Sequence, residues 1–203
     1  MTIQVKISKK LVLYKSAFEL LKKRVDSIKK HKSRDLLWIL EHPLTYTAGI
    51  RFDESEILDK KIRIIKTNRG GKVTLHNPGQ KIIYIVLDLN KRKKDIKNLV
   101  RNIENSIIEF LKIYKINSYA DKDNIGVWVN GNKIAAIGIR VTQWIAYHGC
   151  SININNSLNH YKKIVPCGLD NRKITSITKE SNIKIKNVEE NLTKIFLKNL
   201  KNI

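Results

Sequence analysis

The chain has 203 residues, of which 42% are hydrophobic and 29% charged, and this composition predicts one globular domain over residues 1–203. No apolar run is long enough to cross a bilayer, and the N-terminal residues lack the apolar core of a secretory signal, so we expect no membrane contact. The formal net charge of +22 is spread over the whole length and aromatic residues make up only 7%, which argues against nucleic-acid binding and favours acidic partners.

Apolar residues recur at helical spacing in three stretches, residues 11–29, 95–114 and 187–200. Between the helical stretches lie short runs rich in β-branched and aromatic residues, which are typical of buried strands. These runs are residues 36–40, 62–66, 81–89, 125–129 and 133–141. An Asn-Gly step at 130–131 predicts a tight hairpin between the last two runs. The pattern predicts a single α+β domain with a mixed or antiparallel sheet flanked by helices.

Glycine and proline are scarce, with 9 Gly and 3 Pro, yet three glycines and one proline fall in residues 68–80. One interpretation is a tight turn at Gly70 and Gly71 that leads into a buried strand. The other is a loop whose backbone approaches a ligand, with Arg69 and His76 supplying polar groups. The stretch is neither a Walker loop nor a dinucleotide-binding fingerprint, because the required spacing is absent.

Lys133 follows the Asn-Gly hairpin and begins an otherwise apolar strand, where a lysine usually points to water. The small residues Ala135, Ala136 and Gly138 leave room beside this strand for a ligand. Alternation along a strand would place His148 and Cys150 on one face as a candidate Cys–His pair; the alternative is a buried thiol and a hydrogen-bonded histidine.

Cys167 lies between Pro166 and Gly168, on a constrained turn. Reactive cysteines are partly exposed and close to cations, so from the residues alone Cys167 is either a nucleophile or a structural thiol. Two cysteines are too few for a disulfide framework, and neither they nor the five histidines show metal-site spacing. We therefore expect a reducing, cytoplasmic compartment and no metal.

Four motifs taken together resemble the lipoyl(octanoyl) transferases over the whole chain. The motifs are RGGKVTLHNPGQ, GVWVNGNKIAAIGIR, HGCSININ and IVPCGL. The resemblance implies the fold that lipoate-protein ligases share with the catalytic domain of biotin protein ligases. It also implies transfer of an octanoyl group, without a cofactor, from octanoyl-acyl carrier protein to a lysine of a lipoyl domain. The implied acceptors are the lipoyl domains of 2-oxoacid dehydrogenases and the glycine cleavage H protein, and this is the first step of lipoate biosynthesis.

The resemblance assigns Cys167 as the nucleophile that forms an acyl thioester, and Lys133 as the partner that lowers its pKa. The implied acyl-binding residues are Arg69, Gly70, Gly71, Lys72, Val73, Thr74, Leu75 and His76, then Ala136, Ile137 and Gly138, and finally Gly149, Cys150 and Ser151. Leu75 replaces the usual aromatic residue and Asn77 the usual glycine. We expect both to touch the pocket wall and to affect acyl-chain preference.

Two alternatives remain. An ATP-dependent lipoate-protein ligase on the same fold would use a lysine and would not need Cys167, and the PCG turn argues against it. A basic nucleic-acid-binding protein would instead show tight, salt-sensitive binding to nucleic acid.

Overall fold

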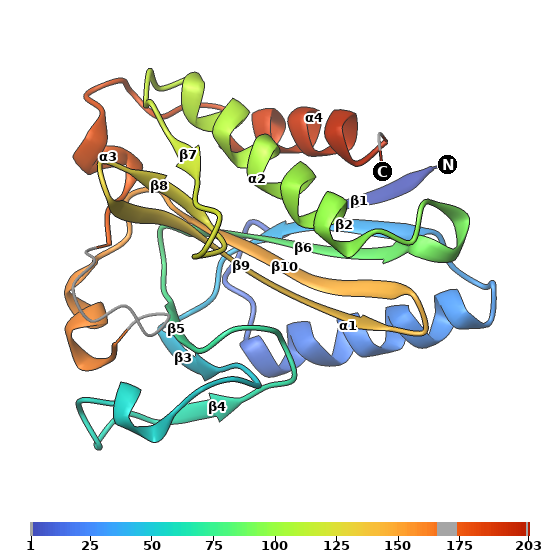
Figure 1. Cartoon of the computed structure of the whole chain (residues 1–203), viewed down its shortest axis with the longest axis horizontal. Helices are drawn as coiled ribbons and strands as arrows, with labels where there is room; N and C mark the ends of the chain where they lie inside the picture. The colour runs from blue at the N-terminus through green and yellow to red at the C-terminus, as the bar shows by residue number, and fades with distance from the viewer. Residues whose placement is uncertain (1, 166–173, 202) are drawn as a thin grey trace.

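The computed structural model describes residues 2–165, 174–201 and 203, and within them the chain forms two sheets with helices around them (Figure 1). The large sheet has the order β1-β2-β6-β10-β9-β8-β7, and the small sheet the order β4-β3-β5. The strands of the large sheet are β1 (Ile3–Ile7), β2 (Asp35–Leu40), β6 (Gln80–Asp88), β7 (Tyr119–Ala120), β8 (Val127–Val129), β9 (Asn132–Thr142) and β10 (Ile145–Asn153). Those of the small sheet are β3 (Thr45–Ala48), β4 (Ile64–Lys66) and β5 (Val73–His76). The helices are α1 (Tyr14–Lys29), α2 (Ile96–Lys112), α3 (Ile177–Glu180) and α4 (Val188–Leu200), with 3-10 turns η1 (Glu54–Glu56), η2 (Leu89–Lys91) and η3 (Asn159–Lys163).

The large sheet is mixed. Its strands β1 and β2 run parallel, and the other neighbouring pairs are antiparallel. The central pair, β6 and β10, is in register from Asp88 opposite Ile145 to Gln80 opposite Asn153. All of β10 is buried, because it has strands on both sides and helices on both faces. The predicted α+β architecture with a mixed sheet is confirmed.

Helices cover both faces of the large sheet: α1 lies on one, and α2 and α4 lie on the other (Figure 1). Alternate residues of β2 divide between these layers, because successive side chains of a strand point to opposite faces. Trp38 packs with the α1 layer, whereas Leu37 and Ile39 pack with the α2 and α4 layer. Burying each such side chain stabilises the fold by about 1.5–3 kcal/mol.

The helix α2 begins at a side-chain cap. Asp95 Oδ1 accepts a hydrogen bond of 2.9 Å from the Asn98 N–H, and this satisfies a donor that the first turn leaves unpaired. Its apolar face, which includes Leu99, Ile103 and Ile107, is fully buried against the sheet. The cap and the buried face fix where the first turn of α2 lies, and that turn forms one side of the site described below.

Along β9, only the first residues pair with β8, and this leaves the rest of that edge of β9 open as the place where the site is built. Val127 pairs with Ala135 but Trp128 pairs with Lys133, so Ile134 is an extra residue that forms a β-bulge. In the described part of the chain, no strand lies beside the outer edge of β9 beyond this bulge. Residues 68–72 cross that edge instead, and the Gly70 N–H donates to the carbonyl oxygen of Ile139 at 3.3 Å.

Candidate active site

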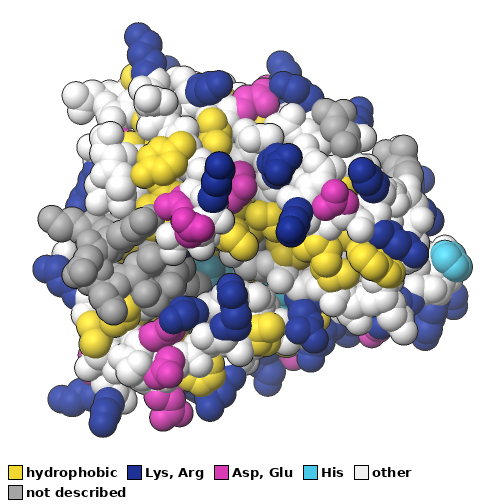
Figure 2. Space-filling model, viewed as in Figure 1, with side chains coloured by type: hydrophobic (Ala, Val, Ile, Leu, Met, Phe, Trp, Pro, Cys, Tyr) yellow, Lys and Arg dark blue, Asp and Glu magenta, His cyan; other side chains and the backbone are white. Residues whose placement is uncertain are grey.

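A cavity of about 530 Å³ lies where the 68–72 loop crosses the open edge of β9. The first turn of α2 and the loop at residues 123–125 form its other side. Figure 2 shows a hollow across this face, lined by hydrophobic side chains and bordered by lysine and arginine side chains. Most of the residues that the sequence singles out line it: Arg69, Gly70, Gly71, Lys72, Thr74, His76, Lys133, Ala136, Ile137, Gly138, Gly149, Cys150 and Ser151.

The strand β5 explains which members of the glycine-rich motif reach the cavity. Thr74 and His76 line the cavity, whereas Val73 and Leu75 point to the opposite side, into the core of the small sheet. Asn77 turns away from the cavity too, and donates from Nδ2 to the carbonyl oxygen of Ser157 at 2.8 Å. The structure therefore corrects the expectation that Val73 contacts an acyl chain and that Leu75 and Asn77 touch the pocket wall.

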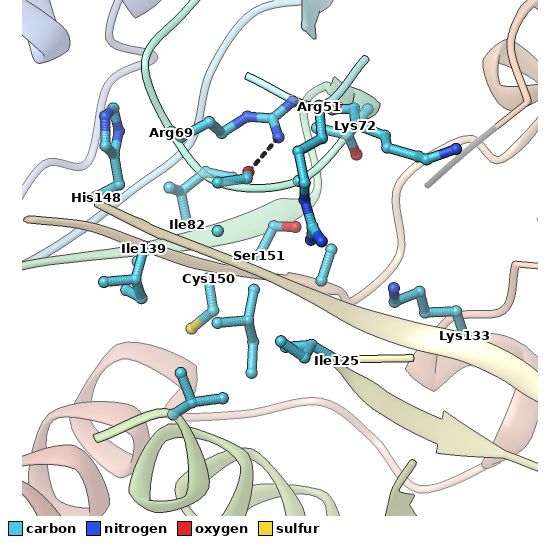
Figure 3. Close-up of a pocket in the computed structure, with 18 of the residues that line it drawn as sticks. Arg51, Arg69, Lys72, Ile82, Ile125, Lys133, Ile139, His148, Cys150 and Ser151 are labelled. Carbon is cyan, nitrogen blue, oxygen red and sulfur yellow. Dashed lines mark hydrogen bonds between the residues drawn. The ribbon is translucent and has the colours of Figure 1, made fainter. Parts of the chain in front are cut away.

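Arg69 holds the glycine loop together. Its guanidinium donates to the carbonyl oxygens of Gly70 (3.0 Å), Thr47 (2.8 Å) and Lys72 (2.8 Å), and to Thr47 Oγ1 (2.9 Å). Figure 3 shows the bond to Gly70 above the strands of the cavity floor. This arginine thus shapes the cavity wall by holding the backbone of the loop.

Glycine is required where this loop meets β9. A Cβ on Gly70 would lie 2.9 Å from the Ile139 carbonyl oxygen, and one on Gly138 would lie 3.0 Å from the Gly70 carbonyl oxygen. The loop backbone therefore packs directly on the strand backbone. Both interpretations of the motif hold in part: it leads into a strand, and its backbone lines a cavity.

Asn68 joins the glycine loop to β10. Its Nδ2 donates to the hydroxyl of Tyr147 at 2.6 Å, and its Oδ1 accepts from Nε2 of His148 at 2.8 Å. Because Oδ1 can only accept, the ring hydrogen of His148 is on Nε2. Two neighbouring side chains of β10 therefore fix the position at which the loop enters the cavity wall.

His148 and Cys150 do not share a face, so the candidate Cys–His pair does not form, and the structure agrees with the alternative of a buried thiol and a hydrogen-bonded histidine. The backbone at His148 is left-handed, with φ 70°, and this residue alone departs from the alternation, since Ala146 and Cys150 lie in the same layer. The His148 ring stacks on Phe18 of α1 with centroids 5.5 Å apart, whereas Cys150 joins the layer of α2 and α4. Figure 3 shows the two side chains pointing in opposite directions. Burial raises the pKa of the Cys150 thiol far above its usual value and lowers the pKa of His148 to about 3.

His76 is buried and neutral at the floor of the cavity. Its Nδ1 donates to Gln80 Oε1 at 2.8 Å, so the lone pair of the ring is on Nε2. Burial lowers the pKa of His76 to about 3. The ring stacks on Tyr14, which the sequence analysis missed and which also lines the cavity.

A third buried histidine, His42, supports this floor and was also missed. Its Nδ1 donates to the Val12 carbonyl oxygen at 2.5 Å, and its Nε2 accepts from the Tyr84 hydroxyl at 2.8 Å. Burial lowers its pKa to about 4. The sequence offers only the position of His42 directly after an apolar strand, which is too weak a signal to identify it.

Lys133 is 5% exposed, and its ammonium group is directed into the cavity (Figure 3). Its Nζ lies 5.0 Å from the centroid of the Trp128 ring, within the range of a cation–π contact. The backbone carbonyl of Lys133 accepts from the Thr175 N–H at 2.9 Å. The described chain thus resumes, after residue 173, directly beside this lysine. Cys167 lies outside the described residues.

The sequence analysis also missed the residues on the far side of the cavity. Ile96 and Val100 come from α2, Ile125 from the loop before β8, and Arg51 from the segment after β3. The three apolar side chains form an apolar wall opposite the glycine loop, and Figure 3 shows Arg51 reaching over the cavity from the loop side. These residues are far apart in the sequence, so only the fold brings them together.

Two absences can be stated for the described part of the chain. Residues 2–165, 174–201 and 203 contain no cluster of three or more histidine, cysteine, aspartate or glutamate side chains able to hold a metal ion. Within the same residues, no helix is long and apolar enough to span a membrane.

Comparison with solved structures identifies the fold. A bi-partite lipoate protein ligase from Thermoplasma acidophilum has a TM-score of 0.74 at 14% identity, over 99% of this chain and 84% of its own. Lipoate-protein ligase A bound with ATP has a TM-score of 0.75 at 13% identity, over 98% and 86%. A biotin protein ligase from Aquifex aeolicus is more distant, with a TM-score of 0.53 at 13% identity, over 98% and 70%. The predicted relation to both ligase folds is confirmed.

The family model described as the lipoyl protein ligase A/B catalytic domain matches residues 14–197, and this match defines the class of the chain. An octanoyltransferase from Wolbachia sp. subsp. Brugia malayi (strain TRS) is 46% identical over 88% of this chain and 89% of its own length. An octanoyltransferase from Anaplasma phagocytophilum (strain HZ) is 44% identical over 87% of this chain and 88% of its own length. The chain therefore belongs to the lipoyl protein ligase A/B catalytic-domain family, and within it to the octanoyltransferases.

Proposed function

We propose that this acyltransferase moves an octanoyl group from octanoyl-acyl carrier protein to a lysine of a lipoyl domain through a thioester on Cys167. The observation that carries the proposal is the buried Lys133 at one end of a cavity whose walls are glycine backbone and isoleucine side chains. The reaction needs a base that is held rigidly beside a site for an apolar chain, and this arrangement supplies both.

The dimensions of the cavity suit an acyl chain of this length. A strand rises about 3.3 Å per residue, so Ala136 to Ile139 spans roughly 10 Å along the cavity floor. An octanoyl chain extended from a carbonyl near Lys133 would lie along these residues. Gly138 and Gly149, paired on neighbouring strands, line the cavity there, and Ile82, Ile137 and Ile139 provide apolar contacts.

In the first half-reaction, Cys167 begins as a thiolate and Lys133 as an ammonium group. The thiolate attacks the carbonyl carbon of the donor thioester, a new S–C bond forms, and the bond to the carrier's sulfur breaks. The leaving thiolate takes a proton from Lys133, which becomes a neutral amine. The products are the acyl-enzyme and the free thiol of the carrier.

In the second half-reaction, the neutral amine of the acceptor lysine attacks the thioester carbonyl. The new amide nitrogen gives its proton to the Lys133 amine, and the Cys167 thiolate leaves. Cysteine and lysine are then back in their starting charge states, so the cycle closes without ATP or an external base. The energy of the donor thioester drives both steps.

The assignment of Cys167 rather than Cys150 is supported by the state of Cys150. This second thiol is buried, and burial raises its pKa, so it holds almost no thiolate near neutral pH. We therefore assign Cys150 to the cavity wall. The proposed partners also fit the formal charge of +22, since acidic carrier and lipoyl domains would be attracted to the basic rim visible in Figure 2. The proposed compartment is the cytoplasm.

The decisive experiment incubates the pure protein with octanoyl-acyl carrier protein in the absence of ATP. Intact-mass and peptide mass spectrometry should find one octanoyl group on Cys167, removable by neutral hydroxylamine. The label should be lost in Cys167→Ser and retained in Cys150→Ala. A label on Cys150 would reassign the nucleophile, and modification of lipoyl domains only when ATP and free octanoate are supplied would establish the ligase alternative.

A further inference from the structure

Glu104 is a buried carboxylate that the transfer chemistry above does not use. It lies on the inner face of α2, close to Ile103 and Ile107, and is 9% exposed. Burial raises the pKa of its carboxyl, while a hydrogen bond from Gly126 and the charges of Arg101 and Lys133 act in the opposite direction. A carboxylate on a buried apolar face is costly unless its partners compensate. The groups that contact the Glu104 carboxylate therefore indicate its role.

The carboxylate of Glu104 holds the backbone immediately before β8. The Gly126 N–H donates to Glu104 Oε1 at 3.3 Å. Gly126 has φ +139°, and a Cβ there would lie 2.5 Å from Cε of Lys133 and 2.7 Å from the Ala135 carbonyl oxygen. The backbone that Glu104 holds is therefore the surface against which the end of the Lys133 side chain rests.

Two further groups confine the same side chain. The Trp128 ring lies under the Lys133 ammonium, and Nε1 of this tryptophan donates to the Asn124 carbonyl oxygen at 3.0 Å. On the other side, the Thr175 N–H is bonded to the backbone of Lys133. Among the described residues, Gly126 and Trp128 lie against the end of this side chain, and the ammonium is directed toward the cavity (Figure 3).

In the described part of the chain, several charged side chains lie around Lys133. On α2, Glu104 and Arg101 are near each other, and Asp123 lies on the loop before β8. On the opposite wall, Arg51 reaches over the cavity, and Lys72 forms a salt bridge of 2.7 Å with Glu56. Among these charges, Glu104 is the buried carboxylate that interacts electrostatically with Lys133.

We propose that Glu104 is a positioning residue for Lys133. Through Gly126 it fixes where the amine stands, and its carboxylate adds a negative charge to the surroundings of that amine. This inference rests on the proposed function, in which Lys133 gives up a proton in one half-reaction and recovers it in the other. Glu104 itself does not touch the substrate.

The test compares Glu104→Gln, which keeps the size and removes the charge, with Glu104→Asp, which keeps the charge. The first readout is the rate at which trace acetic anhydride acetylates Lys133 at different pH, followed by peptide mass spectrometry. Labelling should be faster in Glu104→Gln than in the parent, because an opposite charge near the amine is lost. It should stay close to the parent's in Glu104→Asp. Transfer kinetics should show kcat about tenfold lower in Glu104→Gln with little change in KM.

Glu109→Gln is the matched control, since Glu109 lies on the same helix but pairs with Lys198 of α4 at 2.7 Å. It should leave the Lys133 curve and kcat unchanged. The inference is overturned if Glu104→Gln and the parent have superposable labelling curves, or if Glu109→Gln shows the same increase. Full transfer activity in Lys133→Met would refute the proposed function instead, and the labelling curves would still decide whether Glu104 acts on the amine.

Discussion

One backbone angle separates two candidate residues on β10, His148 and Cys150. Because His148 is left-handed, its ring lies under α1 and its Nε2 holds Asn68, while Cys150 stays in the opposite layer. A period of two along a strand assumes an extended backbone at every residue. The local sequence His-Gly-Cys does not predict a left-handed histidine, so the sequence analysis placed both side chains on one face. The error concerned conformation at a single residue, and the strand itself is present.

Lys133→Met should reduce the rate of octanoyl transfer by about 10²–10⁴-fold, the usual loss when a proton-transfer group is removed. It should also slow alkylation of Cys167 near neutral pH if, as the proposed mechanism requires, the Lys133 charge stabilises the Cys167 thiolate. Lys133→Arg should recover little of the transfer rate, since arginine keeps the charge but does not release a proton. Rates are measured with octanoyl-acyl carrier protein and a lipoyl domain. Parent-like rates in Lys133→Met would remove this lysine from the mechanism.

Gly149→Ala should destabilise the protein by about 3 kcal/mol, because its Cβ would be 1.9 Å from the Ile83 carbonyl oxygen, and both strands are central to the sheet. Gly131→Ala is the matched control: its Cβ would meet nothing within 4 Å, and only the left-handed φ of +78° is unfavourable. Its cost should be about 1 kcal/mol. Urea denaturation followed by circular dichroism measures both values. Equal losses in the two variants would contradict the close approach at Gly149.

At the scale of elements, the helices were predicted well and the strands less so. Residues 11–29, 95–114 and 187–200 contain α1, α2 and α4, because each presents one apolar stripe to the sheet. The strand β10 was expected only as the segment that carries His148 and Cys150, and it was not among the apolar runs even though all of it is buried. It carries polar side chains such as Asn153, which donates from Nδ2 to the Thr175 carbonyl oxygen at 2.9 Å. Buried polar groups satisfied by distant partners break the apolar pattern on which strand prediction depends.

The residues of the cavity could also be predicted only in part from the sequence. The glycine motif, the Lys133 strand and the segment at Gly149 could be found from sequence, because local glycine and lysine patterns mark them. The opposite wall could not, because Ile96, Val100 and Ile125 look like ordinary apolar residues until the sheet brings them together. Arg51 likewise reaches the cavity only through its place after β3.

Asn68→Ala should loosen the glycine loop from β10 and raise the KM for the octanoyl donor about tenfold, with a smaller change in kcat. The expected size follows from losing hydrogen bonds to Tyr147 and His148, worth about 1–2 kcal/mol together. Asn90→Ala is the control, since Asn90 bonds to the Gln143 carbonyl oxygen in a turn outside the cavity lining. Steady-state kinetics with both variants decide the point. An unchanged KM in Asn68→Ala would show that the loop keeps its place without this asparagine.

Across the whole molecule, the three buried histidines make stability depend on pH. His42, His76 and His148 surround Tyr84 and Tyr14 between α1 and the sheet. Burial lowers their pKa values to about 4, 3 and 3, against an ordinary value of 6.5. Between those values the unfolded chain binds protons that the folded chain does not. Their contribution to stability is therefore complete above about pH 6.5 and is lost as the pH falls toward 3–4.

The free energy of unfolding should fall by about 4 kcal/mol per pH unit near pH 5, since three groups each contribute about 1.4 kcal/mol per unit. Urea denaturation at pH 8, 6 and 5 measures this slope. His42→Gln should reduce it by about one third. The exposed His31 is the control position, and His31→Asn should leave the slope unchanged. A parent protein equally stable at pH 8 and pH 5 would show that the buried histidines take up protons without unfolding.

The position of β10 at the centre of the large sheet has a consequence for how the protein is made. While the chain is being synthesised, β2 and β6 leave the ribosome long before β10, because residues 89–144 intervene. At about 5–20 residues per second that interval lasts roughly three to ten seconds. During it, the edge of β6 that later pairs with β10 has no neighbouring strand. Chains that end before β10 are therefore expected to aggregate or to bind chaperones, and the nascent protein depends on such protection until its last third has been translated.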